Sequence, residues 1–465
     1  MPQSPARYNK TSVREIYDHA QKLVGLSLAE AVPDREIQEN QKNRGDLGSL
    51  VERHYFEHQP PNNHDPDFAE AGVELKTTGV RRSRGKYSAK ERLVLTMINY
   101  ETIVEEEWES SALLHKCRLM LILFCEYERE TPVTRRRFVM EPLLHMIPTD
   151  EPVAGGHVAD IGVERVLVVP DEDYAQIRRD WQTIQATIRA GRAHELSEGD
   201  TFYLGACRKG SGGPAEHLRV QPYSDELAQG RAFCFKQGYV NSLIEEHKRR
   251  ASQLGVSAER DFDRVTRERF VPHIGKSVEQ LCRDLGVAVR QRVPKNIKRI
   301  IANRILSSSG QESSELAKAG IELKTVRMDC NGRVRESMSF PNFKYLEIVT
   351  QQWEDSSFYE KLEKKFLFVV FQEDRTGVER LQKVFYWNMP FADREEARRV
   401  WEDTKRRVAI DARNLPTASE SHVAHVRPKA TNKKDTELTP QGVQLVKKCF
   451  WLNKAYVESV IAAAV

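Results

Sequence analysis

The sequence has few cysteines, little net charge and no long apolar segment, and each of these absences excludes a class of protein. Its seven cysteines are odd in number and include no CxxC pair, so neither a disulfide framework nor a zinc ribbon is supported. No window reaches the roughly 18 apolar residues that cross a bilayer. The first residues, MPQSPARYNK, contain no apolar core of a secretory signal. We therefore expect a protein of the reducing cytoplasm with no membrane partner.

The balance of charge excludes a strongly basic protein but leaves room for local basic surfaces. With 72 basic and 68 acidic residues, the net charge is only +4. Three segments are nevertheless rich in lysine and arginine: residues 80–92, 295–304 and 426–434. Each could contact phosphate groups, although a solvated loop or helix face is the more ordinary explanation for any one of them alone.

The chain of 465 residues is too long for one ordinary core, and it repeats itself. The string AGVELKTTGV (71–80) returns as AGIELKTVRM (319–328). Three further pairs of strings keep the same order in the two halves: VGLSLAEAV and IGKSVEQLC, EEWESSALLHKC and QQWEDSSFYEKL, AFCFKQGYV and CFWLNKAYV. A chance match would not keep this order over four landmarks. We predict two copies of one domain, residues 1–248 and 262–465, joined by a polar linker at 249–261.

Within the first copy, the spacing of apolar residues predicts a mixed α/β domain. The run CRLMLILFCEY (117–127) is almost continuously apolar, which is typical of a central buried strand. Helical spacing marks three segments, residues 11–25, 47–57 and 171–191. Thr11 or Ser12 is the expected N-cap of the first helix. Further strands are predicted at 72–80, 92–98, 200–206 and 216–222.

One predicted strand carries charged residues in a pattern suited to phosphodiester hydrolysis. Alternate side chains of a strand share a face, so Glu74 and Lys76 point the same way and Leu75 points into the core. If the preceding segment runs alongside, Asp67 brings its carboxylate to that of Glu74. Two carboxylates and the backbone carbonyl of Leu75 are hard oxygen ligands for Mg²⁺, which polarises a phosphate and activates a bound water. Lys76 can orient that water and offset the charge that develops at phosphorus.

The spacing D-x6-E-x-K is weak evidence alone, because it occurs by accident in about one chain in ten of this length. An edge strand with exposed charges would look the same. The longer string PDFAEAGVELKTTGV (66–80), however, resembles the active-site segment of the MutH and Sau-type GATC endonuclease family, within the PD-(D/E)xK nuclease superfamily. The resemblance extends to three more strings, RGDLGSLVERHYF (44–56), WESSALLHKCRLMLI (108–122) and EGDTFYLGACRKG (198–210). It covers most of residues 10–250 and, more weakly, 262–465.

The resemblance implies two tandem MutH-like domains of the restriction-endonuclease fold, each a mixed sheet flanked by helices. It implies a further acidic metal ligand at Glu52 and a lysine near the active site at Lys116. The implied cofactor is Mg²⁺, and the implied substrate is double-stranded DNA containing GATC, cut 5′ of the G. A cognate DNA methyltransferase would accompany the enzyme in its host without binding it. A dimer or a DNA-looped assembly stays open.

The two copies differ at the positions that matter for catalysis. When the copies are aligned on their ELK strings, Glu322 and Lys324 are kept, but Glu315 stands in the place of Asp67. Its longer side chain moves the carboxylate outward, and Mg²⁺ demands near-ideal geometry. The position of Glu52 falls near Asn303, and that of Lys116 falls near Glu363 or Lys364. We therefore expect a degraded metal site in the second copy.

The segments that contact DNA in this family show the opposite trend. The Arg-Pro-Lys segment is intact in the second copy as HVRPKA (425–430), whereas the first copy reads HLRVQPYS (217–224). The arginine of the first copy is shifted by two residues, which keeps it on the same face of a strand. A later segment places aromatic residues before a lysine in both copies. The candidate DNA-binding residues are Arg219, Gln221, Phe235, Lys236, Arg427, Lys429, Trp451 and Lys454.

We predict a type II restriction endonuclease in which the first copy cuts and the second copy binds another GATC site as an effector. Two alternatives stay open. A MutH-type mismatch-repair nickase is a single copy that acts with repair partners, so the duplication argues against it. A non-catalytic DNA-binding regulator is disfavoured because Asp67, Glu74 and Lys76 are all present. The second copy could also be a decayed duplicate that is kept for packing.

Overall fold

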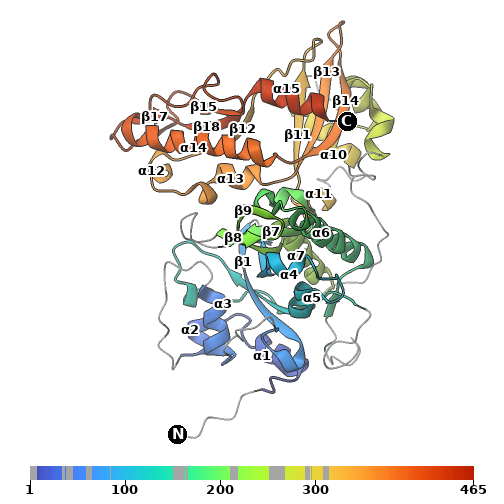
Figure 1. Cartoon of the computed structure of the whole chain (residues 1–465), viewed down its shortest axis with the longest axis vertical. Coiled ribbons are helices and arrows are strands. Elements are labelled where there is room, and N and C mark those ends of the chain that lie inside the picture. Colours follow the sequence, from blue (N-terminus) through green and yellow to red (C-terminus); the bar gives the residue numbers. More distant parts are fainter. Residues whose placement is uncertain are drawn as a thin grey trace. The chain divides into compact units, whose positions relative to one another are not determined.

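The computed structural model describes residues 8–33, 37, 46–58, 65–83, 85–149, 163, 166–209, 218–250, 266, 268–287, 294, 296–306 and 314–464. The predicted linker, 249–261, lies outside the described residues from position 251 onward. Two compact units are present. Unit 1 comprises Met1–Leu196, Thr201–Glu259 and Lys318–Gly320, and unit 2 comprises Ser197–Asp200, Arg260–Ala317 and Ile321–Val465. Both contain helices and sheets (Figure 1), so the predicted mixed α/β class is confirmed.

The central element of unit 1 is a five-stranded mixed sheet in the order β2-β1-β4-β5-β6. Strand β1 pairs in parallel with β4 and places Glu74 opposite Met120, while β4 and β5 are antiparallel. Seven of the eight residues of β4 are buried, as its continuous apolar run predicts. The strands are β1 (Val73–Ser83), β2 (Lys86–Ala89), β4 (Leu119–Glu126), β5 (Leu143–Met146) and β6 (Val166–Val168).

Several helices of unit 1 begin at polar caps that the sequence provides. Of the two expected caps for α1, the structure selects Ser12, whose hydroxyl accepts a hydrogen bond from the Glu15 N–H at 3.4 Å. Helix α3 continues into a π-helical turn, η1, which carries Glu52. The helices are α1 (Val13–Gln21), α2 (Leu28–Ala31), α3 (Asp46–Leu50), η1 (Val51–Tyr55), α4 (Tyr100–Ile103), α5 (Ala112–Cys117), α6 (Asp171–Arg189) and α7 (Gln237–Arg250).

A second, smaller sheet and a hairpin complete unit 1. The sheet has the order β3-β10-β7, and the hairpin joins β8 to β9. Strand β10 is buried over its whole length, which places its aromatic side chains in the interior. The strands are β3 (Leu93–Met97), β7 (Leu204–Arg208), β8 (Leu218–Gln221), β9 (Ser224–Gln229) and β10 (Arg231–Phe235).

Unit 2 repeats the plan with a shorter main sheet, in the order β11-β13-β14. Its β11 and β13 are parallel and place Glu322 opposite Phe366, while β13 and β14 are antiparallel. A second sheet has the order β12-β18-β15, and β16 and β17 form a hairpin. The strands are β11 (Glu322–Met328), β12 (Met338–Asn342), β13 (Phe366–Glu373), β14 (Glu379–Trp387), β15 (Ala424–Pro428), β16 (Thr436–Leu438), β17 (Gln444–Val446) and β18 (Lys448–Leu452).

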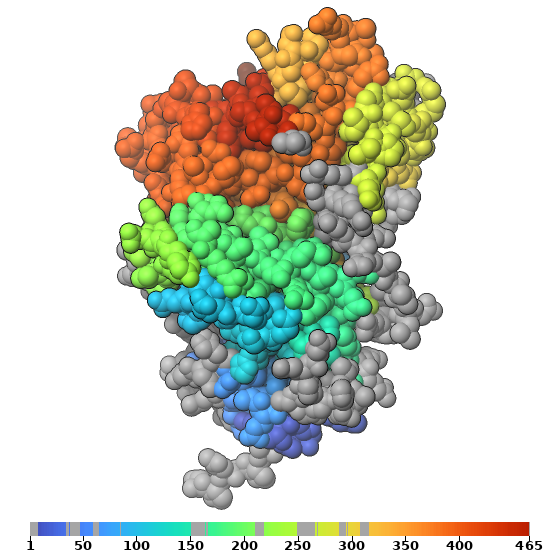
Figure 2. All heavy atoms as spheres, turned by 45° about the vertical axis from the view of Figure 1, so that its right-hand side comes forward, coloured from blue at the N-terminus to red at the C-terminus, as the bar shows by residue number. Residues whose placement is uncertain are grey.

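The longest helix of unit 2 covers its aromatic core. In the space-filling view of Figure 2, the orange and red atoms of this unit form one continuous surface. The core beneath it includes Trp353, Phe358, Phe368 and Trp401. The helices are α9 (Val278–Asp284), α10 (Ile297–Leu306), α11 (Ser314–Lys318), α12 (Tyr345–Ile348), α13 (Ser357–Leu362), α14 (Phe391–Asp411) and α15 (Lys454–Ala463).

Local details repeat between the units as the sequence does. Helices α2 and α9 each begin with a capping box, made by Ser27 with Glu30 and by Ser277 with Gln280. A tryptophan pair recurs as well. The ring centroids of Trp108 and Trp181 lie 5.7 Å apart, as do those of Trp353 and Trp401. These matches place α5 and α13, which both follow the first tryptophan of the pair, at corresponding points of the two units.

Two further observations concern features that the sequence lacks. No helix within the described ranges is both long and apolar enough to cross a membrane. All seven cysteines fall in described parts of the chain, and each carries a free thiol. Six of these thiols are buried and only Cys330 is exposed.

Candidate active site

In unit 1 the start of β1 is folded so that two carboxylates lie side by side. The turn η2 (Ala69–Ala71) ends at Gly72, whose φ of +65° suits a residue without a side chain. This turn brings Asp67 back onto the strand. The Asp67 N–H donates to Glu74 Oε2 at 3.0 Å, and the Leu75 N–H donates to Asp67 Oδ2 at 2.9 Å. Both acidic side chains are buried, and the structure brings them together as the sequence predicts.

Two lysines approach the same carboxylate from different elements. Lys76, two residues along β1, places its Nζ 2.6 Å from Glu74 Oε1. Lys116 extends from the last turn of α5, and its Nζ lies 3.8 Å from the same oxygen. Lys116 also donates to the backbone carbonyl of Asp65 at 3.2 Å. Both lysines singled out in the sequence therefore reach the site.

Glu52 completes the acidic group from the π-helical turn η1. Burial, together with the nearby negative charge of Asp67, raises the pKa of Glu52 to about 7, and Glu74 adds to the effect. Burial also raises the pKa of Glu74, and Asp67 contributes to this rise against the opposing charge of Lys76. The raised values have a common cause, since three carboxylates share a partly desolvated site with too little positive charge.

These residues fit a divalent cation by their chemistry. Carboxylate oxygens and a backbone carbonyl such as that of Leu75 are the hard donors that Mg²⁺ prefers. A cation would also relieve the repulsion that raises the pKa of Glu52 and Glu74. Within the described ranges no three His, Cys, Asp or Glu side chains already converge as metal ligands. Asp67 and Glu74 instead accept hydrogen bonds from backbone N–H groups.

Three further residues lie next to this site, and sequence reasoning assigned none of them a role in it. Burial raises the pKa of the Cys117 thiol to about 12, and the charges of Lys76 and Glu74 also act on it. His115 is exposed and lies 2.8 Å from Asp65 through Nε2 and Oδ1. The ring of His58 packs against Phe68 beside the Asp67 turn. No pattern in the sequence marks these residues, because their proximity depends on how α5 and η1 pack.

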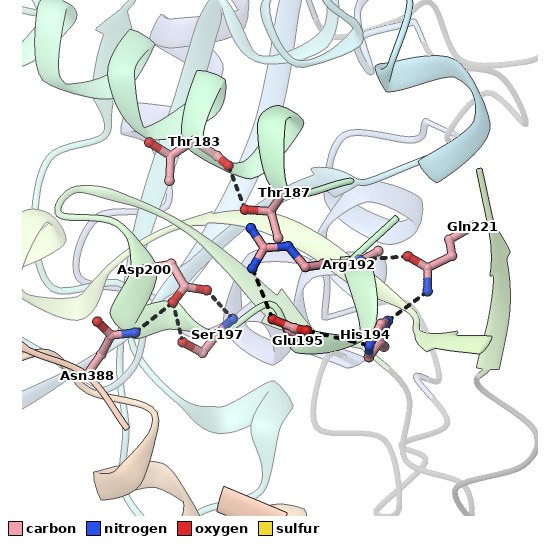
Figure 3. Close-up of polar contacts among 10 residues, drawn as sticks. Thr183, Thr187, Arg192, His194, Glu195, Ser197, Asp200, Gln221 and Asn388 are labelled. Carbon is pink, nitrogen blue, oxygen red and sulfur yellow. Dashed lines mark hydrogen bonds and ion pairs between the residues drawn. The ribbon is translucent and has the colours of Figure 1, made fainter. Parts of the chain in front are cut away.

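The structure places the DNA-binding candidates of unit 1 differently from the prediction. Arg219 and Gln221 were expected on one face, but the register of β8 and β9 shifts between them. Arg219 is exposed, whereas Gln221 is only 3% exposed. Figure 3 shows the Gln221 side chain turned towards the 193–195 turn. It accepts from the Ala193 N–H at 2.7 Å and donates to the Glu226 carbonyl at 2.6 Å, so it anchors the hairpin.

The later pair of candidates in unit 1 is buried. Phe235 is fully buried, with its ring centroid 4.7 Å from that of Tyr239. Lys236 is 7% exposed and donates to the Thr201 carbonyl at 2.5 Å. Both side chains are therefore buried in this structure, and their contact with DNA stays a prediction. The aromatic-lysine string positions β10 within the core instead.

In unit 2 the corresponding carboxylate is surrounded by lysines. Lys361 donates a hydrogen bond to Glu322, and Lys324 Nζ lies 3.3 Å from Glu322 Oε2. Lys361 occupies the penultimate position of α13, as Lys116 does in α5. The sequence alignment had placed the counterpart of Lys116 near Glu363 or Lys364; the helices show that it is Lys361. Glu363 is buried and lies 3.7 Å from Arg394, away from this role.

The segment before β11 also departs from its counterpart in unit 1. In unit 1, Asp67 lies in a turn whose next residue, Phe68, bridges to Val73. In unit 2, Glu315 lies in the helix α11. The backbone at this position therefore differs between the two units, and the loss of a second metal ligand in unit 2 stays a prediction.

The DNA-binding candidates of unit 2 lie on β15, β18 and the start of α15. Arg427 is exposed, and its guanidinium lies 4.2 Å from the ring centroid of Trp451, which fixes the two side chains together. Lys429 donates to the Phe340 carbonyl at 2.8 Å. Lys454 is exposed at the first position of α15. This surface therefore presents a guanidinium and an ammonium group to solvent.

Comparison with known proteins finds the same family in each of the two copies. The family model described as "DNA mismatch repair enzyme MutH" matches residues 56–153 and again 306–400. The type II restriction enzyme Sau3AI of Staphylococcus aureus is 32% identical over 94% of this chain and 92% of its own length. The DNA mismatch repair protein MutH of Shewanella woodyi is 22% identical, over 51% of this chain and 93% of its own. That of Shewanella amazonensis is 26% identical over 50% and 95%.

Proposed function

This chain belongs to the family of the type II restriction enzyme Sau3AI and MutH, and from that membership we propose that it makes Mg²⁺-dependent double-strand cuts in DNA at GATC. The membership itself makes the chain a restriction endonuclease that acts on DNA. The target sequence, the cut on the 5′ side of the G, the metal ion and the division of labour between the units are the proposal. The observation that carries it is the buried group of Asp67, Glu74 and Lys76 in unit 1.

Asp67, Glu74, Glu52 and the Leu75 carbonyl are the residues of unit 1 that would hold Mg²⁺. When bound there, the ion polarises a phosphate and lowers the pKa of a bound water. The backbone N–H of Leu75 holds the Asp67 carboxylate in place, and the packing of β1 on β4 fixes both residues. Main-chain hydrogen bonds therefore hold the Asp67 and Glu74 carboxylates, and Lys76 adds a side-chain hydrogen bond to Glu74.

The two lysines of unit 1 supply positive charge where negative charge develops. Lys76 lies within hydrogen-bond distance of Glu74 and can orient a water for attack on phosphorus. Lys116 lies slightly farther from Glu74, so its ammonium is available to a phosphate oxygen that approaches the same carboxylate. Charge stabilisation of this kind contributes most in a site that is shielded from water, as this one is.

We propose that cutting belongs to residues 1–248 and binding of a second DNA site to residues 262–465. Unit 1 has acidic residues that lack enough compensating cations, whereas Glu322 of unit 2 is already neutralised by Lys361 and Lys324. Unit 2 keeps the exposed Arg427 and Lys429 of the DNA-contacting segment. This asymmetry supports one catalytic unit and one effector unit. The GATC target rests on the resemblance of residues 66–80 to the GATC-cutting family.

A plasmid assay separates this proposal from its two alternatives. Unmethylated supercoiled plasmid with several GATC sites is incubated with the full chain and Mg²⁺, and the products are sequenced at their ends. We expect linear fragments with 5′-GATC ends. Slow nicks without linear products would indicate a MutH-type nickase, and binding without any cleavage would indicate a regulator. Ends at another sequence would reject GATC while leaving the nuclease assignment intact.

A further inference from the structure

In unit 2 the start of β11, which corresponds to the candidate active site of unit 1, carries a cluster of ammonium groups that is open to solvent. Lys361 and Lys324 contact the two oxygens of Glu322, and their side chains are 31% and 29% exposed. Lys364 lies next to them, 28% exposed and 3.6 Å from Glu360. The Lys324 Nζ also lies over the ring of Phe366, 5.7 Å from its centroid. The lysines are therefore held in position without being covered.

The balance of charge at this position is opposite in the two units. In unit 1 three carboxylates meet two ammonium groups, and burial with the charge of Asp67 raises the pKa of Glu74. In unit 2 Glu322 contacts the ammonium groups of Lys324 and Lys361, and the charge of Lys364 also acts on it. There burial acts against ionisation, but the hydrogen bond from Lys361 and the charges of Lys324 and Lys364 outweigh it and lower the pKa of Glu322. A phosphate would be repelled by the carboxylates of unit 1 unless a cation were bound there. In unit 2 the lysines already supply positive charge.

We propose that Lys324 and Lys361, with Lys364 beside them, form a metal-independent binding site for a backbone phosphate of the second DNA duplex. The proposal rests on the proposed function, which assigns a DNA-binding role to unit 2. An ammonium group has three N–H donors, so Lys361 can keep its hydrogen bond to Glu322 and donate another to a phosphate oxygen. Glu322 then serves as the residue that positions Lys361.

The alternative is that Lys361 and Glu322 form an ordinary structural ion pair. Partly exposed pairs of this kind stabilise a fold only slightly. A structural pair would also not require both Lys324 and Lys361 on the same carboxylate. The two explanations differ in what happens to DNA binding when either partner is changed, and this difference defines the test.

The test counts the GATC duplexes bound by the full chain in EDTA, using native mass spectrometry and a salt titration. The wild-type chain is expected to bind two duplexes without a divalent cation. Lys361→Ala should weaken binding of the second duplex by about threefold to tenfold and reduce the slope of log K against log salt by about 0.9. Lys324→Ala should act in the same direction. Lys344→Ala is the control, since Lys344 is an exposed lysine of unit 2 that pairs with Glu347 of α12.

Glu322→Gln separates a phosphate site from a metal site, because these two predict opposite signs for DNA binding. Removing the carboxylate charge frees Lys361 for phosphate, so binding of the second duplex in EDTA should stay equal or become tighter. Lys361→Arg should keep binding because it keeps the charge. If Glu322 were a metal ligand, Glu322→Gln would instead weaken binding in Ca²⁺. Thermal unfolding of each variant shows whether unit 2 remains folded.

The outcomes distinguish the effector role of unit 2 from the phosphate site proposed within it. A wild-type chain that never binds a second duplex would overturn the effector role and the phosphate site together. A second duplex bound only in Ca²⁺ would overturn the phosphate site alone. Second-site binding that Lys361→Ala and Lys324→Ala leave unchanged would do the same, and the effector role would stand on Arg427 and Lys429.

Discussion

Units 1 and 2 share the string ELK at the start of a parallel strand, yet the two strings lie in opposite electrostatic surroundings. Glu74 has acidic neighbours and a raised pKa, whereas Glu322 has basic neighbours and a lowered one. Lys116 lies 3.8 Å from Glu74 Oε1, and its counterpart Lys361 bonds to Glu322 directly. The comparison teaches that the motif sets the strand and its two charged side chains, and that neighbouring elements decide whether a cation is needed there.

The difference arises from the chain segment before the strand. Gly72 and Gly320 both have a φ of +65°, so each strand is entered through the same left-handed residue. Before Gly72, however, the chain forms a short turn that returns Asp67 to the strand, and before Gly320 it forms the helix α11. A change confined to a few residues therefore gives the two strands different preceding segments.

The largest expected effect is on cleavage by unit 1. Glu74→Ala removes a metal ligand and the partner of Lys76, so we expect single-turnover cleavage in Mg²⁺ to fall by about 10³-fold or more. Binding of the duplex in Ca²⁺ should be largely kept. Asp67→Ala and Lys76→Ala should have similar effects, whereas Glu322→Ala should change the cleavage rate far less. Comparable losses from Glu74→Ala and Glu322→Ala would mean that both units cut.

Much of the difference in charged residues between the two units could be predicted from the sequence. The shared face of Glu74 and Lys76 follows from strand periodicity, and the buried run of β4 follows from its apolar residues. The sequence alignment of the two copies also shows that Glu315 stands in the place of Asp67 in the second copy. The identity of Lys361 as the counterpart of Lys116 was not visible in the sequence, because the loop between helix and strand differs in length and only the helices reveal the match.

The burial of the predicted DNA-binding residues of unit 1 was harder still to foresee. A bulge in the β8–β9 hairpin turns Gln221 inward while Arg219 stays exposed, and bulges leave no clear mark in a sequence. Phe235 and Lys236 look like surface residues in an aromatic-lysine string, but β10 is covered on both faces. Strand periodicity alone cannot show whether a strand has one buried face or two.

The next largest effect concerns communication between the two DNA sites. If unit 2 binds an effector duplex, a plasmid with two GATC sites should be cut faster per site than one with a single site, by roughly 5- to 150-fold. Added GATC oligonucleotide should rescue the single-site plasmid. Replacing Arg427 and Lys429 together with alanine should remove the difference. Equal rates on both plasmids, unaffected by the double substitution, would reject the effector role. Unit 2 would then be a duplicate that is kept for packing.

A smaller effect separates the acid stability of the two units. His145 lies opposite Met120 and is fully buried; burial lowers its pKa to about 3, whereas Trp387 stands at the corresponding place in unit 2. Below pH 6.5, His145 takes up a proton in the unfolded chain but stays neutral in the folded unit. The free energy of unfolding of unit 1 should therefore fall by about 1.4 kcal/mol per pH unit. Hydrogen exchange of β4 and β13 amides at pH 7 and pH 5 measures this. His145→Leu should remove the pH dependence from β4, and an equal loss in β13 would contradict the assignment.

The smallest effect uses two matched helix caps. Ser111 Oγ accepts from the Leu114 N–H at 3.3 Å and begins α5, and Ser356 Oγ accepts from the Tyr359 N–H at 3.1 Å and begins α13. Replacing either serine with alanine should cost about 1 kcal/mol of stability. Only Ser111→Ala loosens the helix that holds Lys116 near Glu74, so it alone should slow the single-turnover step, by several-fold. Ser111→Thr keeps a capping hydroxyl and should restore the rate. An equal slowing by Ser356→Ala would show that the α13 helix, and with it Lys361, takes part in cutting.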